Sequence, residues 1–370
     1  MNDKTRDIPC KRLLVIMPGL LGESIMATAM LHAIRQAHPE AHITALIKRR
    51  LRPVLHGLDC VDRVLSIRKH SKQGGKGKPK KGRSSLVRLS RRLARGNFDT
   101  AVILPLSFKA AALPTLAGVK RRIGYESDGR AVLLTDRLVA RHHKVDKSRN
   151  ASIDGYLTFA RYLGAHHPGA AMHQALRPEA GQRLSQRLQD VGVDADQQEL
   201  LLVNPGAPTA DRRWSPRRMA HLCEMLGERF GMVPVVTGTP AERAVVQDLL
   251  ERATVPIVDL PELGRDLHLL KAMVARSRMM VTNDTGPRFL AAAMGVPVLT
   301  LFGPTSPQGS GISVSHEEQV ISDEISIAAK SDPSFTGRAS LDVLHADEVF
   351  EHASQLYETT RTLHVTGQGS

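Results

Sequence analysis

The sequence has few aromatic residues, few cysteines and no long apolar run, and each scarcity excludes a class of protein. Phe, Trp and Tyr make up 4% of the 370 residues, so the cores must be built from Ala, Val, Leu, Ile and Met. The three cysteines are isolated and odd in number, which predicts neither a disulfide framework nor a zinc site. No apolar stretch approaches the roughly 20 residues that span a bilayer, and the first residues lack the apolar centre of a secretion signal. We therefore expect a cytoplasmic protein, with peripheral binding to the inner face of the cytoplasmic membrane left open.

Acidic residues are absent between residues 68 and 92, although this segment holds eleven of the basic residues behind the net charge of +14. Glycines and a proline at 74–82 disfavour a helix or strand, so we expect 68–92 to be a basic loop. Three interpretations are open: contact with an anionic membrane surface, binding of nucleic acid, or a solvated loop without a partner. Nucleic acid is the weakest of these, because no aromatic residues are interleaved with the charges.

The order of apolar segments predicts two domains of alternating strands and helices. In the first half, strands are expected at 13–17, 43–47 and 100–104, with a helix at 24–37. In the second half the alternation of strands and helices resumes, with strands expected at 200–203, 233–237, 257–259 and 279–282 and helices at 216–230, 241–252 and 267–275. This pattern is typical of α/β domains with parallel sheets. We place the domains at 1–180 and 181–345, and we expect a last helix at about 346–363.

The segment 278–307 reads as strand, turn, helix, second strand and Gly-Pro loop. Asn283-Asp284-Thr285-Gly286 forms the turn, Pro287 suits a first helical turn, and Gly295 is expected to end the helix. Amides at the start of such a helix point at one spot, where the helix dipole favours an anion such as a diphosphate. An ordinary structural turn in an α/β sheet is the alternative.

The same residues resemble a known signature. The segment is similar to the donor-binding motif of glycosyltransferase family nine, the bacterial lipopolysaccharide heptosyltransferases, which carries Asn-Asp-Ser/Thr-Gly-Pro and a later Phe-Gly-Pro-Thr. Three further matches occur in the right order: the turn 18–28, the segment 121–136, which resembles the subgroup that adds the second heptose, and 204–207 followed by Arg212-Arg213-Trp214.

The resemblance implies an α/β fold of the GT-B type, with two facing Rossmann-like domains, a cleft between them and a last helix that packs back on the amino-terminal domain. It implies an inverting transfer of heptose from ADP-heptose to a lipid A–core acceptor, which is a phosphorylated glycolipid. No cofactor is then required, and a divalent metal is optional, because Arg212 and the helix terminus neutralise the diphosphate.

The resemblance also assigns the site. Glu23, after Gly22, stands where the family has an Asp that acts as the base, and Ser107 and Lys109 resemble an acceptor-side motif. Phe289 replaces a His that is common in the family, and Arg212 replaces a Lys. The donor-binding positions are Thr209, Arg212, Glu242, Leu263, Asp284, Thr285 and Gly286. Within this set, Asp284 is expected to bind sugar hydroxyls, Glu242 the ribose, and the backbone at Leu263 the adenine.

Other interpretations of these residues remain open. Glu23 and Glu242 are also acids of the kind that favour a helix amino terminus, and Lys109 suits a surface. Trp214, the only tryptophan, is expected to anchor its loop. Asp194-Ala195-Asp196 has the spacing of a metal-binding carboxylate pair, but it lies in a polar region away from any strand-end glycine turn, so we expect a solvated loop. The histidine pairs at 142–143 and 166–167 have no carboxylate or Cys at ligand spacing, so we expect no structural metal. The rival functions are a transferase of the same fold with another nucleotide sugar or acceptor, and a nucleotide-sugar-binding protein with weakened catalysis.

Overall fold

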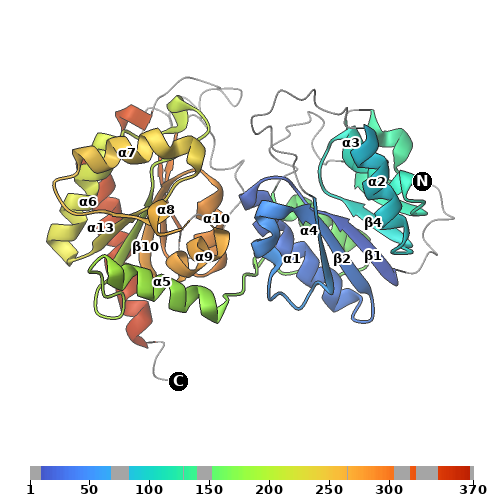
Figure 1. The fold of residues 1–370 in the computed structure, drawn as a ribbon, viewed down its shortest axis with the longest axis horizontal. Coiled ribbons are helices and arrows are strands. Elements are labelled where there is room, and N and C mark those ends of the chain that lie inside the picture. The colour runs from blue at the N-terminus through green and yellow to red at the C-terminus, as the bar shows by residue number, and fades with distance from the viewer. Residues whose placement is uncertain are drawn as a thin grey trace. The chain divides into compact units, whose positions relative to one another are not determined.

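The computed structural model describes residues 10–67, 83–127, 129–139, 152–264, 266–303, 317–321 and 341–366. The chain divides into two compact units, Met1–His173 and Gln174–Ser370 (Figure 1). The boundary lies a few residues before the predicted one at 180/181. Helix α5, at Pro178–Asp190, begins the second unit and packs on α9, at Leu267–Arg276, of that unit.

The amino-terminal unit contains a parallel sheet with the strand order β3-β2-β1-β4-β5-β6. Its strands are β1 (Arg12–Ile16), β2 (His42–Lys48), β3 (Arg63–Ile67), β4 (Thr100–Ile103), β5 (Arg121–Tyr125) and β6 (Asp136–Leu138). Its helices are α1 (Leu21–Ala37), η2 (Arg49–Leu55), α2 (Arg83–Ala94), α3 (Phe108–Leu116), η3 (Arg130–Leu133) and α4 (Ile153–Tyr162).

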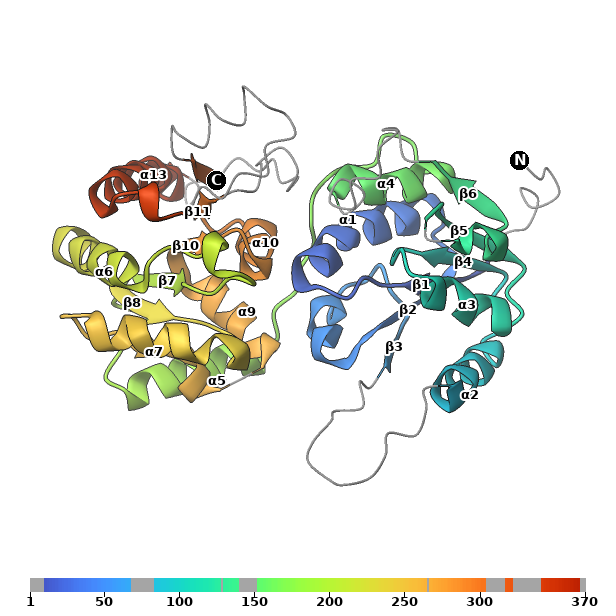
Figure 2. The ribbon, with the colours of Figure 1, turned by 90° about the horizontal axis from the view of Figure 1, so that it is seen from above.

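Helices cover both faces of this sheet. Figure 2 shows α1 and α4 on one side of the strands and α2 and α3 on the other. One core lies between the sheet and α2 and α3, and it includes Leu14, Ile16, Ala101 and Leu93. Strands buried on both faces in this way carry apolar residues in continuous runs, as β1 and β4 do.

The predicted basic loop is wrong over its second part, because Arg83–Ala94 forms helix α2. Leu86, Leu89 and Leu93 recur at helical spacing and pack against the core of the unit. The exposed side of the helix carries Arg88, Arg91 and Arg92. Residues 68–82 lie outside the described part of the chain.

The carboxyl-terminal unit contains a second parallel sheet, with the order β12-β11-β10-β7-β8-β9. Its strands are β7 (Leu200–Asn204), β8 (Val233–Val236), β9 (Val258–Asp259), β10 (Ser277–Asn283), β11 (Val298–Phe302) and β12 (Glu317–Ile321). Its other helices are η5 (Ala210–Arg212), α6 (Pro216–Phe230), η6 (Pro240–Glu242), α7 (Arg243–Arg252), α8 (Leu260–Leu263), α10 (Gly286–Ala293), η7 (Leu341–Val343) and α13 (Ala346–Thr366).

The last helix packs within its own unit. Val349, Ala353 and Leu356 join the core formed by β7, β10, β11 and α6, and the Tyr357 ring lies 4.3 Å from the ring of Phe230. The predicted packing of this helix on the amino-terminal domain stays a prediction. Val349, Ala353, Leu356 and Tyr357 are buried in the carboxyl-terminal unit, and Ala346 and Phe350 are partly buried there.

Candidate functional site

The predicted donor-binding residues share one edge of the carboxyl-terminal sheet. Thr209 and Arg212 follow β7, Glu242 follows β8, Leu263 follows β9, and the segment 284–286 follows β10. All of these strands are parallel, so their carboxyl ends lie at the same edge. In space the order is β10, β7, β8, β9, which spans about 14 Å at the usual strand spacing. This edge is where ligands bind in open α/β sheets.

Arg212 and Asp284 form an ion pair at the centre of this edge. Arg212 Nη2 donates to Asp284 Oδ2 at 2.9 Å, and the two side chains are 31% and 13% exposed. Asp284 Oδ1 accepts a second hydrogen bond, at 2.8 Å, from Nη1 of the fully buried Arg288. Both carboxylate oxygens are thus engaged by guanidinium groups. Asp284 fixes the position of Arg212, and its predicted contact with sugar hydroxyls stays a prediction.

A buried asparagine fastens the Arg212 loop to β10. Asn283 Nδ2 donates to the carbonyl oxygens of Pro205 and Gly206, at 3.0 and 3.1 Å. Its Oδ1 accepts the backbone N–H of Trp214 at 3.1 Å. The fully buried Trp214 also donates Nε1–H to Leu344 O at 3.0 Å, so its predicted role as an anchor is confirmed. The loop between 205 and 214 is therefore held at both ends.

Changing Asn283 to Ala is expected to lower the free energy of unfolding by about 3 kcal/mol, because it leaves two carbonyls and one N–H without this side chain. Denaturant unfolding followed by the fluorescence of Trp214 measures the change. Gln189→Ala, at an exposed position of α5, is the control, and we expect it to stay within about 0.5 kcal/mol of the parent. A similarly small change for Asn283→Ala would contradict the role of this side chain.

The amino terminus of α10 supplies backbone donors beside Arg212. Thr285 is extended, and Gly286 begins the helix. The first N–H groups of a helix have no partner within it, and the dipole adds partial positive charge there. The Thr285 hydroxyl accepts a hydrogen bond from Asn204 Nδ2 at 2.8 Å, so it is directed to β7. Gly295, with a φ of 70°, follows the helix end, as predicted.

Glu242 and Thr209 each make a local hydrogen bond. Glu242 Oε2 accepts the N–H and the hydroxyl of Thr239, both at 2.7 Å, and thereby completes a capping box. This supports the first-turn interpretation of Glu242, and its contact with ribose stays a prediction. A hydrogen bond from the exposed Thr209 hydroxyl lowers the pKa of Asp211. The predicted donor contact of Thr209 likewise stays a prediction.

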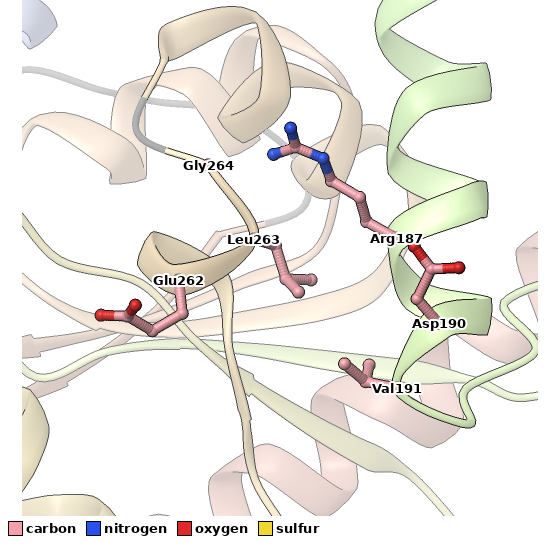
Figure 3. A pocket seen from close by; sticks show the side chains of 6 residues that line it. All are labelled: Arg187, Asp190, Val191, Glu262, Leu263 and Gly264. Carbon is pink, nitrogen blue, oxygen red and sulfur yellow. The ribbon is translucent and has the colours of Figure 1, made fainter.

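Leu263 borders an open hollow of about 360 Å³ at the end of β9 (Figure 3). Its lining residues are Arg187, Asp190, Val191, Glu262, Leu263 and Gly264. Figure 3 shows the Arg187 guanidinium reaching from α5 toward Gly264. A Cβ atom on Gly264 would lie 2.3 Å from Arg187 Nη1, and the φ of 155° disfavours any side chain there. A side chain at 264 would therefore displace the Arg187 guanidinium next to the predicted nucleobase position.

In the amino-terminal unit, Glu23 lies in the first turn of α1, after β1. Burial raises the pKa of its carboxyl group, while the amides of Leu20 and Gly19 and the charge of Lys48 partly oppose the rise. Lys48 also donates to Gly19 O at 2.9 Å. The pKa of Tyr156 is raised chiefly by burial and further by the Glu23 charge. A half-buried carboxylate with a raised pKa is suited to accept a proton near neutral pH.

The other predicted acceptor-side residues follow neighbouring strands. Gly22 is buried beside Glu23 after β1, and Ser107 and Lys109 follow β4, which pairs with β1. Ser107 caps α3, because its Oγ accepts the N–H of Ala110 at 3.4 Å. Lys109 is exposed. The parallel strands bring these residues to one edge of the sheet, and their contact with an acceptor stays a prediction.

Sequence reasoning missed Arg288 and Glu317, which are buried behind Asp284. The four-residue spacing between Asp284 and Arg288, across the start of a predicted helix, could have indicated this ion pair. Phe289 is 8% exposed, and its ring lies 5.2 Å from the Arg288 guanidinium. Phe289 is therefore a packing residue of this unit. Within the described residues, no three His, Cys, Asp or Glu side chains gather closely enough to hold a metal ion.

These features define a class of protein: two Rossmann-like α/β units of the GT-B type, one of which presents an arginine and a helix terminus at the carboxyl ends of its strands. The family model "Glycosyltransferase family 9 (heptosyltransferase)" matches residues 86–334. The chain belongs to this family and is a glycosyltransferase enzyme.

Curated relatives and solved structures agree with this assignment. The chain is 26% identical over 307 residues to lipooligosaccharide heptosyltransferase 2 of Haemophilus influenzae, covering 80% of this chain and 84% of the relative. It is 25% identical over 320 residues to lipopolysaccharide heptosyltransferase 2 of Escherichia coli, covering 84% and 87%. A family 9 glycosyltransferase from Veillonella parvula has a TM-score of 0.80 at 24% identity, and E. coli ADP-heptose heptosyltransferase II has 0.76 at 20%; each comparison covers 95% of this chain and 99% of the other.

Proposed function

We propose that this protein transfers a heptose from ADP-heptose to the lipid A–core acceptor in lipopolysaccharide biosynthesis, with inversion at the anomeric carbon. The observation that carries the proposal is the alignment of Arg212, the start of α10 and the hollow at Leu263 along one sheet edge. A nucleoside diphosphate extended along this edge would place its phosphates at β10 and β7 and its base at β9. The relatives that share the family carry heptosyltransferase in their names.

In the proposed reaction, Glu23 takes the proton of the acceptor hydroxyl as its oxygen attacks the anomeric carbon. The bond from that carbon to the diphosphate oxygen breaks, and ADP leaves with the electron pair. Arg212 and the amides at the start of α10 stabilise the charge that develops on the diphosphate. Since these groups supply positive charge, we propose that no metal ion is required.

A transfer assay tests this proposal. The protein is incubated with a deacylated lipid A–core acceptor and, in parallel, with ADP-heptose, ADP-glucose, UDP-glucose or GDP-mannose, each with and without EDTA. We expect a mass gain of one heptose with ADP-heptose, unaffected by EDTA. Robust transfer from another nucleotide sugar and none from ADP-heptose would overturn the donor assignment. Binding of ADP without any transfer would overturn the enzymatic proposal.

A different donor sugar is the second candidate, and the geometry around Asp284 favours it. Both Asp284 oxygens are engaged by arginines, and Phe289, at a position where His is common in the family, is buried. The sugar-binding part of the site therefore differs from the pattern that the resemblance implies. The panel of nucleotide sugars separates the two candidates.

The charge of Lys48 provides a pH test of Glu23 as the base. Since that charge lowers the pKa of Glu23, Lys48→Met should raise it further and move the acidic limb of the kcat/KM profile to higher pH. The rate falls as pH drops through this pKa, because only the carboxylate accepts the proton. Lys120→Met, at an exposed position of the same unit, is the control. An acidic limb that does not move in Lys48→Met would contradict Glu23 as the titrating group.

We also propose that the exposed arginines of α2 contact an anionic membrane surface. No described helix combines the length and the apolar composition that crossing a bilayer requires. Each basic residue near an anionic surface contributes at most about 1 kcal/mol. The triple variant Arg88→Glu/Arg91→Glu/Arg92→Glu should therefore lose sedimentation with phosphatidylglycerol vesicles, while phosphatidylcholine vesicles bind neither protein. Equal sedimentation of variant and parent would overturn this contact.

A further inference from the structure

A chain of four charged side chains runs from the Arg212 loop into the interior of the carboxyl-terminal unit. Arg212 pairs with Asp284, Asp284 pairs with Arg288, and Arg288 pairs with Glu317. The exposed fractions of the four side chains fall from 31% at Arg212 through 13% at Asp284 to 0% and 1% at the inner two. The outer end of this chain is part of the proposed diphosphate site, and the inner end is buried.

Glu317 is fixed from several sides. It receives two hydrogen bonds from Arg288, from Nε and, at 3.1 Å, from Nη2. Thr300 Oγ1 donates to its Oε1 at 2.8 Å and Gln319 Nε2 to its Oε2 at 3.0 Å. These donors lie on β11 and β12, so the sheet itself sets the position of the Glu317 carboxylate. Paired hydrogen bonds between a guanidinium and a carboxylate fix orientation as well as distance.

Arg288 occupies a position that is unfavourable for an isolated cation. It lies in the first turn of α10, where the helix dipole is positive, and it is fully buried. Its guanidinium lies 5.2 Å from the centre of the Phe289 ring and 4.8 Å from that of Phe302. The two carboxylates and the two ring faces offset the cost of burial. The helix terminus therefore depends on Glu317 and Asp284 to hold this arginine.

We propose that Arg288 and Glu317 are positioning residues of the donor site, which hold Asp284 so that its outer oxygen orients Arg212 for the diphosphate. Arg288 also offsets the charge of Asp284, which would otherwise repel the diphosphate that Arg212 attracts. This inference rests on the proposed function and deepens it. It assigns a role to two side chains that are buried behind Asp284.

The test removes both charges of the inner pair together. In Arg288→Met/Glu317→Gln, Asp284 loses Arg288 and keeps its ion pair with Arg212, and no buried charge is left behind at 288 or 317. We expect the dissociation constant of ADP, measured by isothermal titration calorimetry, to rise on the order of tenfold, since a charge-assisted interaction is lost. The dissociation constant of adenosine should change less than about twofold, because adenosine carries no phosphate. The fluorescence of Trp214 reports whether the unit remains folded.

A double-mutant cycle shows whether the pair acts through Asp284. In an Asp284→Asn background, the same double change should weaken ADP binding by much less than it does in the parent. Losses that add in full would overturn the proposal. Equal weakening of ADP and adenosine would also overturn it, because that pattern indicates a general structural effect.

Two further outcomes separate this inference from the proposed function. If the parent protein does not bind ADP, the proposed function fails. If the parent binds ADP and the double variant binds it equally tightly, only the positioning role fails.

Should the double variant lose the Trp214 signal of the folded unit, Arg288→Lys replaces it. Lys keeps the charge but lacks the planar fork, so ADP binding should weaken while adenosine binding does not, and parent-like ADP binding would overturn the proposal.

Discussion

Glu23→Gln is expected to slow sugar transfer by about 10²–10⁴-fold, because Gln retains the shape of the side chain but cannot accept a proton. The dissociation constant of ADP should stay within about twofold of the parent, since the diphosphate residues belong to the other unit. Single-turnover transfer of heptose, with both substrates saturating, measures the chemical step. Burial raises the pKa of Glu23 above that of an ordinary glutamate, and a raised pKa makes its carboxylate a stronger base.

Glu40→Gln is the matched control for this experiment. Glu40 is an exposed acid of the same unit, and it lies before β2 rather than after a strand. Its variant should transfer sugar as fast as the parent. If Glu23→Gln also transfers sugar at the parental rate, the base lies elsewhere.

Arg212→Ala is expected to lower kcat by on the order of a hundredfold and to weaken ADP binding, because it removes a partly exposed side-chain cation at the carboxyl edge of the sheet. The change also removes the ion-pair partner of the outer Asp284 oxygen, so the charge of this carboxylate is less completely offset. Arg212→Lys should recover part of the loss, since it restores the charge without the fork. Steady-state kinetics with varied ADP-heptose separates the effects on kcat and KM.

Arg217→Ala is the control for the loss of one positive charge in this region. Arg217 is exposed on α6, five residues after Arg212. We expect parental kinetics from this variant. Parental kinetics from Arg212→Ala as well would mean that the diphosphate is held by other groups.

The elements with clear start and stop signals were predicted from the sequence alone. The bounds of α6 agree with the prediction at both ends, because Pro216 suits the first turn and Gly231 adopts a φ of 71° after the last residue. The strands β1, β2, β7 and β10 were also found within a few residues. Helix α2 was missed, since glycines and basic residues before it concealed the helical spacing of Leu86, Leu89 and Leu93.

The sequence predicted that Arg212 and Asp284 lie at the strand ends, but it did not predict the buried pair of Arg288 and Glu317 behind them. The positions of Arg212 and Asp284 after parallel strands follow from local sequence, because a turn after a strand fixes the edge on which it lies. Arg288 and Glu317 lie 29 positions apart in the sequence. Glu317 belongs to β12, which lies outside the motif at 278–307. The contacts of α13 with the core of its own unit were not predicted either, because an apolar helical face predicts burial but does not identify the element on which it packs.

Hydrogen exchange with and without ADP tests most directly whether the carboxyl edge of the second sheet is the nucleotide site. We expect slower amide exchange in two segments on addition of ADP: the loop 205–213 after β7, and residues 285–290 at the start of α10. Peptides from α2 should show no change. Protection confined to other segments, or no protection at concentrations that saturate ADP binding, would contradict this placement of the nucleotide site.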